Sequence, residues 1–296
     1  MKPKSLALSL GVAVLLCMST AFAQTYTFQT INYSGDTFTQ LLGINNENEI
    51  AGYHGFAVNQ GFTYSIAGKK FTSENYPGSA MTQVIGINNN PKTVGFYVST
   101  GGTTSGFTYY HGTFTSVAYP GEPFNQLLGQ NDYGQAVGYY STSPTGAGPD
   151  TAYIFDEFGI VFEAFEIPGS TSAQATGINN AGSVCGFYVD GAGVSHGWVE
   201  VQGHFTVINA PKSTATAALG LNNAGQVVGT WTDTSGNSHG FVYTISPKHF
   251  VSVDDPEGIG ETIVNGINDK GSLVGFYGPS ACTTNNCQGF VATVAP

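Results

Sequence analysis

One unit recurs six times along the chain, and its spacing limits the possible folds more than any other feature. A complete copy reads GINNAGSVCGFY at residues 177–188, with an Asn pair, a small-residue turn and an apolar run. The first glycine of the copies is Gly43, Gly86, Gly129, Gly177, Gly220 and Gly266. These positions are 43, 43, 48, 43 and 46 residues apart. Periods of roughly 20–50 residues indicate a repeat architecture in which each unit packs against its neighbours.

Each copy holds four short runs rich in Val, Ile, Phe, Tyr and Thr, separated by Gly, Asn and Pro. Such runs predict four strands per unit, which is typical of a β-propeller blade. We therefore predict an all-β fold, a six-bladed β-propeller with four strands per blade. The expected blades are approximately residues 38–78, 81–121, 124–169, 172–212, 215–258, and 261–296 together with 24–35.

The two ends of the repeat array are expected to form one blade. The sixth copy stops at GFVATVAP and lacks a fourth strand, whereas YTFQTINYSG at 26–35 resembles the fourth run of the other copies. An N-terminal strand that completes the last blade would close the ring and remove an exposed edge. An open solenoid is the alternative, and the displaced half-unit argues against it.

The first 23 residues have the pattern of a secretory signal peptide. Lys2 and Lys4 precede an apolar run from Leu6 to Leu16, and an A-x-A cleavage site ends at Ala23. Cleavage there leaves one domain, residues 24–296. No later stretch approaches the ~20 apolar residues of a membrane-spanning helix. We expect a monomer that is secreted to the periplasm or the outside of the cell, without membrane insertion.

Charge restricts the partners of the chain. It carries 8 basic residues, all lysine, against 19 acidic ones, a net charge of −11. Nucleic acid binding needs clustered Lys or Arg opposite phosphates, so nucleic acid is excluded as a partner. A neutral or cationic ligand, or a divalent cation, suits an acidic protein better.

The cysteines are assigned structural positions. Cys282 and Cys287 lie five apart in an Asn/Thr-rich segment of an exported chain, which predicts a local disulfide. Zinc is the weaker alternative, because no second Cys/His pair has ligand spacing. Cys185 lies in the apolar run of the fourth copy and is interpreted as a small buried residue. We predict no metal and no cofactor.

The Asn pair is interpreted as a hairpin turn between the first two strands of a blade. Asn bonds nearby backbone and tolerates left-handed φ, and Gly134, Gly182, Gly225 and Gly271 follow it where positive φ is expected. Asn48 takes this place in the first copy. Pro91 takes it in the second, which requires another geometry because proline forbids positive φ. Calcium is the alternative, but it needs about six to eight oxygens and each turn offers few.

The repeat, with its Gly-Ile-Asn-Asn turn, His-Gly-Phe element and Pro-Gly end, resembles the HAF-type extracellular repeat of exported bacterial proteins over nearly the whole mature chain. The His-Ala-Phe element of that family corresponds here to residues 196–198 and 239–241. Gln60, Ser105, Thr151 and Gln288 replace the histidine in the other copies. The resemblance implies an exported repeat protein with a propeller-like fold, and it brings no established activity or catalytic residues.

Residues repeated in every copy are expected to serve the fold, and departures from the repeat to serve function. In a propeller, the loops between blades and between second and third strands open on one face, opposite the Asn turns. An aromatic set ends the second strands and could stack on sugar rings; inter-blade packing is the alternative. Its members are His54, Tyr97, Tyr140, Tyr188, Trp231 and Tyr277.

An acidic loop and two long inserts are further candidates. Asp254, Asp255 and Glu257 depart from the repeat, and with Glu261 and Glu122 they are expected to gather at the rim. Paired carboxylates cleave glycosidic bonds only at defined separations, and a solvated acidic loop is the alternative. The inserts are residues 141–150 and the cystine loop, and long loops on a rigid scaffold often carry binding.

The sequence favours an exported, non-catalytic binding or scaffold propeller that recognises a carbohydrate or cell-surface glycan on its axial rim. One alternative is a polysaccharide-degrading hydrolase or lyase that uses the rim carboxylates. A purely structural extracellular protein is the other. No hydrolase nucleophile, metalloprotease, Walker or dinucleotide motif occurs.

Overall fold

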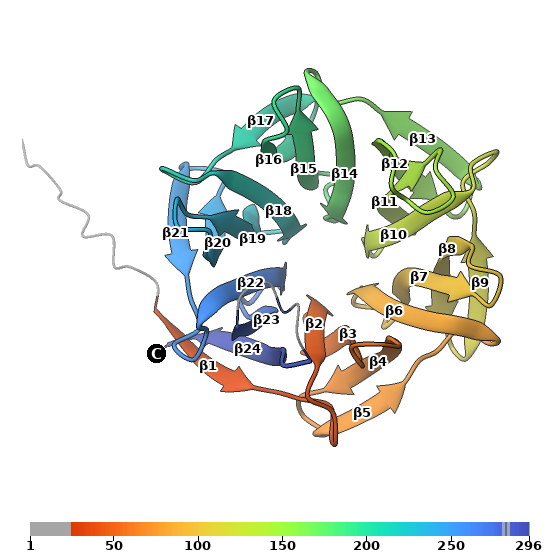
Figure 1. The fold of residues 1–296 in the computed structure, drawn as a ribbon, viewed down its shortest axis with the longest axis horizontal. Coiled ribbons are helices and arrows are strands. Elements are labelled where there is room, and N and C mark those ends of the chain that lie inside the picture. Colours follow the sequence, from red (N-terminus) through yellow and green to blue (C-terminus); the bar gives the residue numbers. More distant parts are fainter. Residues whose placement is uncertain (1–24, 280–281, 283–284, 296) are drawn as a thin grey trace, which may run out of the picture.

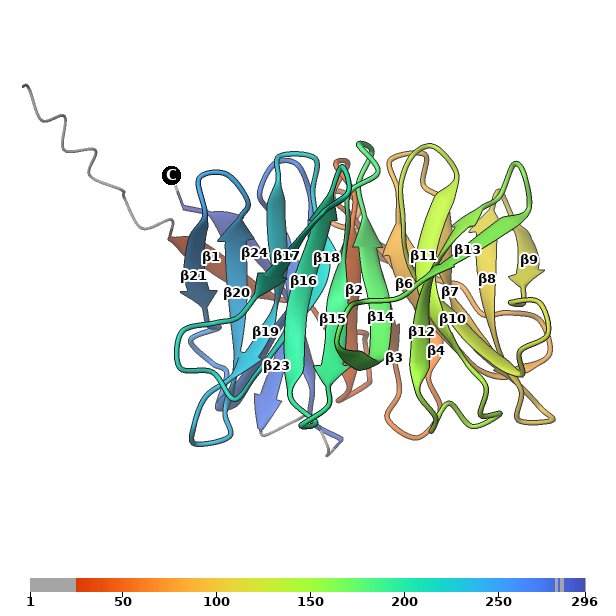
Figure 2. The same cartoon turned by 90° about the horizontal axis from the view of Figure 1, so that it is seen from above.

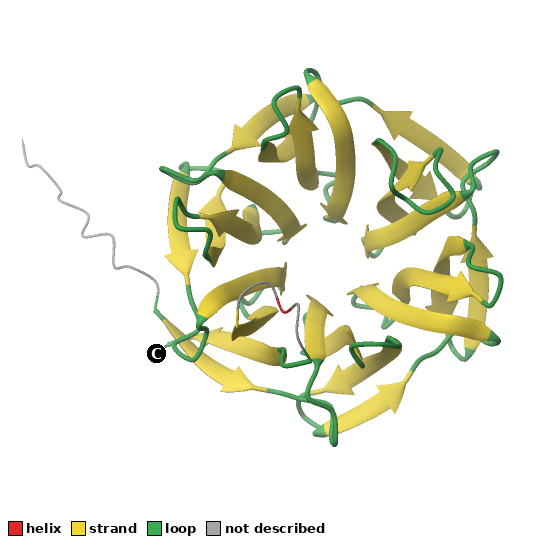
Figure 3. Ribbon diagram, viewed as in Figure 1, coloured by secondary structure: helices red, strands yellow, loops and turns green. Residues whose placement is uncertain are grey.

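The structure is an all-β propeller whose sheets are arranged radially around a central axis (Figure 1). The computed structural model describes residues 25–279, 282 and 285–295. The expected signal peptide lies outside these residues. Strands dominate the described chain, joined by short loops and turns (Figure 3). No helix in the described part is both long and apolar enough to span a membrane.

The strands follow the predicted blades, counted here as blades 1 to 6 with the first strand of each nearest the axis (Figure 1). Blade 1 contains β2 (Thr39–Ile44), β3 (Glu49–His54), β4 (Gln60–Ser65) and β5 (Lys70–Ser73). Blade 2 contains β6 (Ser79–Ile87), β7 (Thr93–Ser99), β8 (Thr104–Tyr110) and β9 (Thr113–Val117). Blade 3 contains β10 (Phe124–Gln130), β11 (Gln135–Ser141), β12 (Asp150–Asp156) and β13 (Val161–Phe165).

The second half of the chain repeats this order. Blade 4 contains β14 (Ser170–Ile178), β15 (Val184–Asp190), β16 (Ser195–Val201) and β17 (His204–Ile208). Blade 5 contains β18 (Ala215–Leu221), β19 (Gln226–Thr232), β20 (Ser238–Thr244) and β21 (His249–Val253). Blade 6 contains β22 (Gly260–Ile267), β23 (Leu273–Pro279), β24 (Gln288–Val294) and the N-terminal β1 (Tyr26–Thr30).

Blade 6 is built from both ends of the chain, as the sequence predicts. Strand β1 pairs antiparallel with β24, from Tyr26 opposite Val294 to Thr30 opposite Phe290. A single parallel pair, Ser238 with Glu261, joins blades 5 and 6 into one eight-stranded sheet. Elsewhere each blade is a separate four-stranded antiparallel sheet.

The core lies between the blades. The Gly-Phe element of each third strand supplies one aromatic ring with no exposed surface, and these rings are Phe62, Phe107, Tyr153, Trp198, Phe241 and Phe290. Fully burying a side chain of this size contributes about 1.5–3 kcal/mol. Cys185 is a buried free cysteine within this core, as predicted. Cys282 and Cys287 form the predicted disulfide.

The first glycine of the repeat is required by close approach of the first strands at the axis. A Cβ atom on Gly43 would lie 2.7 Å from the carbonyl oxygen of Ile85 in the next blade. A Cβ atom on Gly129 would lie 2.7 Å from the carbonyl oxygen of Thr176. Real Cβ atoms do not reach such distances, so any other residue would push neighbouring blades apart. This packing explains why all six copies carry glycine here.

The Asn turns have the predicted local geometry, with positive φ at Asn48 and at the four glycines. In the last copy, the Asn268 Oδ1 atom accepts the backbone N–H groups of Lys270 and Ser272. The sequence did not predict a second contact, in which each side-chain Nδ2 donates to a backbone carbonyl of the next blade. The donor–acceptor pairs are 45–88, 88–131, 131–179, 179–222, 222–268 and 268–45, at 3.0–3.2 Å.

The second residue of each turn adds a parallel set of hydrogen bonds. The backbone N–H of Asn46 donates to Asn89 Oδ1, and the same contact recurs at every blade up to Asp269 with Asn46. The carboxylates of Asp132 and Asp269 each also accept two side-chain amides. We call the twelve residues of the six turns the asparagine belt. The side-chain oxygens of the second turn residues therefore serve contacts between blades. The turns lie at one end of the strands (Figure 2).

Candidate functional site

A cavity of about 240 Å³ lies on the axis, above the glycine layer and away from the asparagine belt. Four glutamines from the first strands of blades 1–4 line it, namely Gln40, Gln83, Gln126 and Gln174. Thr176, Asn265 and aliphatic side chains also line it, and three second-strand rings add aromatic faces, namely Tyr53, Phe96 and Phe187. We call the four glutamines and the three rings the axial cup. Beyond it the axis narrows to cavities of about 80 and 70 Å³ at the glycines and the belt.

Most cup amides are held in place by hydrogen bonds. The Tyr53 hydroxyl donates to Gln40 Oε1 at 2.6 Å. The Nε2 atom of Gln83 donates to Asn59, and that of Gln174 donates to Asp150, both at 2.7 Å. Gln126 has no side-chain hydrogen bond to another described residue. Its amide is therefore available to a ligand, within a wall whose other amides are already oriented.

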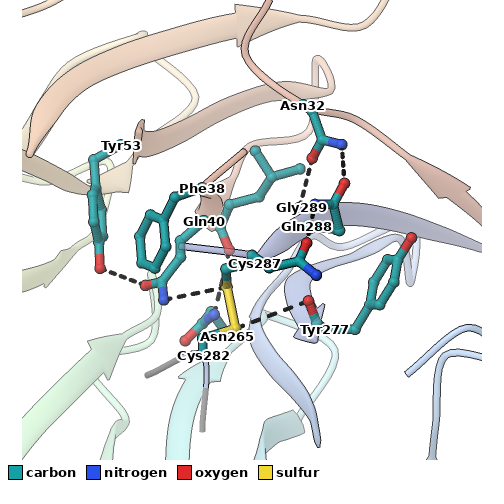
Figure 4. Close-up of a disulfide and its surroundings, with 12 residues drawn as sticks. Asn32, Phe38, Gln40, Tyr53, Asn265, Tyr277, Cys282, Cys287, Gln288 and Gly289 are labelled. Atoms are coloured by element: carbon teal, nitrogen blue, oxygen red, sulfur yellow. Dashed lines mark hydrogen bonds between the residues drawn. A yellow bond between two sulfur atoms is a disulfide. The ribbon is translucent and has the colours of Figure 1, made fainter. Parts of the chain in front are cut away.

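Both long inserts contact residues of the cup. In the cystine loop, Cys287 lies beside Gln40, whose Nε2 atom is 3.7 Å from its sulfur. Figure 4 shows the disulfide next to Gln40 and Tyr53. The insert 141–150 ends at Asp150, the partner of Gln174. Burial raises the pKa of Asp150, against the opposing effect of that hydrogen bond.

None of the six residues of the predicted aromatic set lines the axial cup. His54, Tyr97 and Tyr140 are each covered by a tyrosine from the preceding inter-blade loop. The stacked pairs are Tyr33 with His54, Tyr76 with Tyr97 and Tyr119 with Tyr140, at centroid distances of 3.6, 3.7 and 4.0 Å. Inter-blade packing, the alternative interpretation, describes these three residues.

Tyr188 and Trp231 have partners within their own blades, and Tyr277 has one in the β21–β22 loop. Tyr188 stacks on His196 at 5.1 Å, and Trp231 stacks on His239 at 4.5 Å. Tyr277 is 5 % exposed, and its hydroxyl donates to Glu257. Adjacent strand residues point to opposite faces of a sheet. The residues one position earlier, Tyr53, Phe96 and Phe187, therefore reach the cup instead.

The two histidines of the repeat element are fixed by acceptors. His196 lies 3.1 Å from Asp190 and 2.9 Å from Asn209. His239 lies 3.0 Å from Asp254 and 3.5 Å from Asp233. A backbone N–H from Asn237 is the main cause that lowers the pKa of Asp233 to about 2. These carboxylates are already engaged within the protein.

The acidic residues do not gather around an open cavity. Asp254 pairs with His239, and Asp255 is 4 % exposed and accepts the backbone N–H of Glu257. Glu261 is 6 % exposed, and burial raises its pKa to about 7. The β9–β10 loop with Glu122 lies across the ring from the β21–β22 loop (Figure 1). The expected gathering of Glu122 with the other carboxylates was wrong, because their blades are on opposite sides of the axis.

Sequence reasoning missed the glutamines of the cup. Gln stands three residues before the repeat glycine in the first four copies, as QLLG, QVIG, QLLG and QATG. Ala217 and Ile263 replace it in the last two. The recurrence of this glutamine in four copies suggested a role in the fold. Its absence from blades 5 and 6 was the available signal for function.

Comparison with known proteins supports the fold. No model of a known protein family and no curated relative matches the chain. A mutant lectin of Aleuria aurantia in complex with Fucalpha1-6GlcNAc superposes with a TM-score of 0.54 and 11 % identity, over 88 % of this chain and 96 % of the lectin. AofleA of Arthrobotrys oligospora superposes with a TM-score of 0.52 and 12 % identity, over 92 % of this chain and 94 % of AofleA. XC5397 of Xanthomonas campestris, a gluconolactonase, superposes with a TM-score of 0.55 and 8 % identity, over 88 % of both chains. At these identities the similarity concerns the propeller fold alone.

Proposed function

We propose that this chain is an exported, non-catalytic carbohydrate-binding protein of the HAF-type repeat class, a closed six-bladed propeller that holds a neutral sugar in its axial cup. One observation carries the proposal: four side-chain amides from consecutive blades surround a cavity of about 240 Å³ together with three aromatic rings. Export rests on the signal-peptide pattern of residues 1–23.

The chemistry of the cup suits a sugar. A side-chain amide both donates and accepts hydrogen bonds, as does a sugar hydroxyl. Tyr53, Phe96 and Phe187 offer faces for the C–H side of a pyranose ring. The cup lining contains no Lys, and the chain is acidic, so an anionic sugar is disfavoured. The likeness in fold to a lectin in complex with a fucosyl disaccharide is in keeping with this class of ligand.

The size of the cup restricts the ligand further. Pockets for drug-sized molecules are about 300–1,000 Å³, so a cup of about 240 Å³ suits one sugar residue at the end of a glycan. The narrow glycine layer beneath it prevents a chain from passing along the axis. We therefore expect recognition of a terminal, uncharged sugar.

The test applies the chain from Gln24 onward to a broad glycan panel and measures both retention and released reducing ends. We expect retention without release, and Gln126→Ala should weaken binding roughly tenfold through about 1.4 kcal/mol of lost hydrogen bonding. Because the Gln126 side chain has no hydrogen bond to another described residue, the variant should have the thermal midpoint of the wild type. Trp231→Ala, remote from the cup, is the matched control.

Each other outcome contradicts part of the proposal. Unchanged affinity in Gln126→Ala would place the glycan outside the cup. Released sugar would favour the polysaccharide-degrading enzyme, and no binding across the panel would favour the purely structural protein.

A further inference from the structure

A separate cavity of about 300 Å³ lies between blades 3 and 4, outside the axial cup. Phe165 and Ile167 of blade 3 form one wall, and Trp198 and Phe205 of blade 4 form the other. Trp198 and Phe205 stack with their centroids 5.8 Å apart. The cavity is thus an apolar space with an aromatic wall.

The first three inter-blade junctions fill the corresponding space with a tyrosine. Each of these tyrosines contacts the third-strand ring and the fourth-strand phenylalanine of the next blade. The ring centroid of Tyr33 lies 5.8 and 5.0 Å from those of Phe62 and Phe71. Tyr76 contacts Phe107 and Phe114 at 6.2 and 5.4 Å. Tyr119 contacts Tyr153 and Phe162 at 5.2 and 5.3 Å.

The junction of blades 3 and 4 lacks this ring. Ile167 stands at the tyrosine position of the repeat, while Trp198 and Phe205 keep the two aromatic positions. Phe205 is 38 % exposed, whereas Phe71, Phe114 and Phe162, which a tyrosine covers, are half-buried. The cavity is therefore the space that a tyrosine side chain occupies in the first three junctions.

Acidic side chains surround this apolar space. Glu163, Glu166 and Glu200 line it, with no Lys or His among the lining residues. None of the three forms an ion pair with another described residue. Carboxylates beside a weakly hydrated aromatic wall attract a cation more strongly than they would in water. They also disfavour an anion and give an uncharged molecule no comparable gain.

We propose that the blade 3–4 cavity binds an organic cation, an ammonium group carried on a ring-sized apolar body. The ring takes the place of the missing tyrosine against Phe205 and Trp198. The ammonium lies among Glu163, Glu166 and Glu200. This site is independent of sugar binding in the axial cup, so either can exist without the other.

Tyramine is the direct probe, because it joins a tyrosine-like ring to an ammonium group. Calorimetric titration of the chain from Gln24 onward is compared with para-ethylphenol, which lacks the charge, and para-hydroxyphenylpropionate, which reverses it. We expect tyramine to bind at least tenfold more tightly than ethylphenol, and the propionate not to bind. Equal affinity for tyramine and ethylphenol, or tighter binding of the propionate, overturns the proposal.

Two variants locate the site. Ile167→Tyr should fill the cavity as Tyr119 does one blade earlier, and abolish tyramine binding without lowering the thermal midpoint. Val207→Tyr, on an exposed position of β17 outside the lining, is the matched control and should bind normally. A folded Ile167→Tyr protein with wild-type tyramine affinity refutes the assignment.

A charge variant tests the acidic rim without altering the packing. Glu166 is exposed, so Glu166→Gln should leave folding intact. It should weaken tyramine binding severalfold while leaving ethylphenol binding unchanged. An unchanged tyramine affinity in both Glu166→Gln and Glu200→Gln contradicts the role of the carboxylates, whatever the folding of Ile167→Tyr.

Discussion

The side-chain amide of Asn268 donates a hydrogen bond to the backbone carbonyl of Asn45 at 3.1 Å, although 223 residues of sequence separate the two. This bond joins the last turn of the asparagine belt to the first. The belt therefore connects blades 6 and 1 at one end of the strands, while β1 and β24 pair at the outer edge. The two ends of the repeat array are thus held together at two places, the asparagine belt and the β1–β24 pair.

One substitution can remove the hydrogen bond that Asn268 donates to the next blade while keeping the hydrogen bonds that it accepts within its own turn. In Asn268→Asp, an oxygen still accepts the N–H groups of Lys270 and Ser272, but the donor to Asn45 is lost. Because Asn268 is buried, we expect a loss of about 2–3 kcal/mol in the free energy of unfolding, measured by urea denaturation. The exposed Asn75→Asp serves as control, and equal losses in both would argue against the belt as a stabilising contact.

Close approach at the axis predicts a steric effect. Gly129→Ala places a methyl group 2.7 Å from the Thr176 carbonyl oxygen, where backbone rather than a flexible side chain must move. We expect a loss of about 1–3 kcal/mol from overpacking. Gly191→Ala, which meets no atom within 4 Å, controls for the general change of glycine to alanine. If the Gly129→Ala and Gly191→Ala variants had the same thermal midpoint, this packing would be refuted.

Glu74 should make stability depend on pH. Burial raises its pKa from 4.5 to about 7, while a hydrogen bond from Thr93 opposes the shift. The folded protein then keeps a proton that the unfolded chain releases, so stability falls as pH rises from 4.5 to about 7. The shift corresponds to roughly 3 kcal/mol. Glu74→Gln should remove this dependence and be the more stable protein above pH 7.

The check on Glu74 is the difference in unfolding free energy between wild type and Glu74→Gln, measured on both sides of this window. The difference should be small at acidic pH and largest at alkaline pH. A difference that is constant with pH would mean that the pKa of Glu74 is the same in the folded and unfolded states.

Cys185 should be inert while the protein is folded. It is buried, and burial raises the pKa of its thiol to about 12, against the opposing effect of Thr176. A thiol reagent should therefore find no reactive group in the folded chain from Gln24 onward. It should titrate one thiol after unfolding without reductant, because Cys282 and Cys287 form a disulfide. Reaction in the folded state would show that the junction of blades 4 and 5 opens readily.

The repeat predicted most of the fold, because each feature it relied on is local. Gly182 and Asn48 have the positive φ that a tight hairpin needs, and the half-unit at 26–35 identified the outer strand of blade 6. The donor role of Asn268 could not be predicted in this way. Periodicity shows that a residue recurs, but it does not show which neighbouring blade its side chain reaches.

The candidate site was predicted only in part, for a reason that lies in the blades themselves. Strand alternation distinguishes a buried face from an exposed one, but both faces of a blade pack against neighbours. Tyr97 and Phe96 therefore look alike in sequence, although only Phe96 lines the axial cup. The blade 3–4 cavity escaped notice because the repeat aligns Ile167 with Tyr119, but it does not show that the tyrosine ring fills a space between blades.

The pairing of β1 with β24 also determines how the protein responds to force. Tyr26 lies opposite Val294, so both chain ends leave the antiparallel pair at the same end. Tension applied between the termini loads the hydrogen bonds of this pair one after another rather than together. Once β1 has peeled away to Thr30, the load passes to the loop that enters blade 1. We expect this propeller to be mechanically weak when it is pulled by its ends, and strong when it is pulled across its blades.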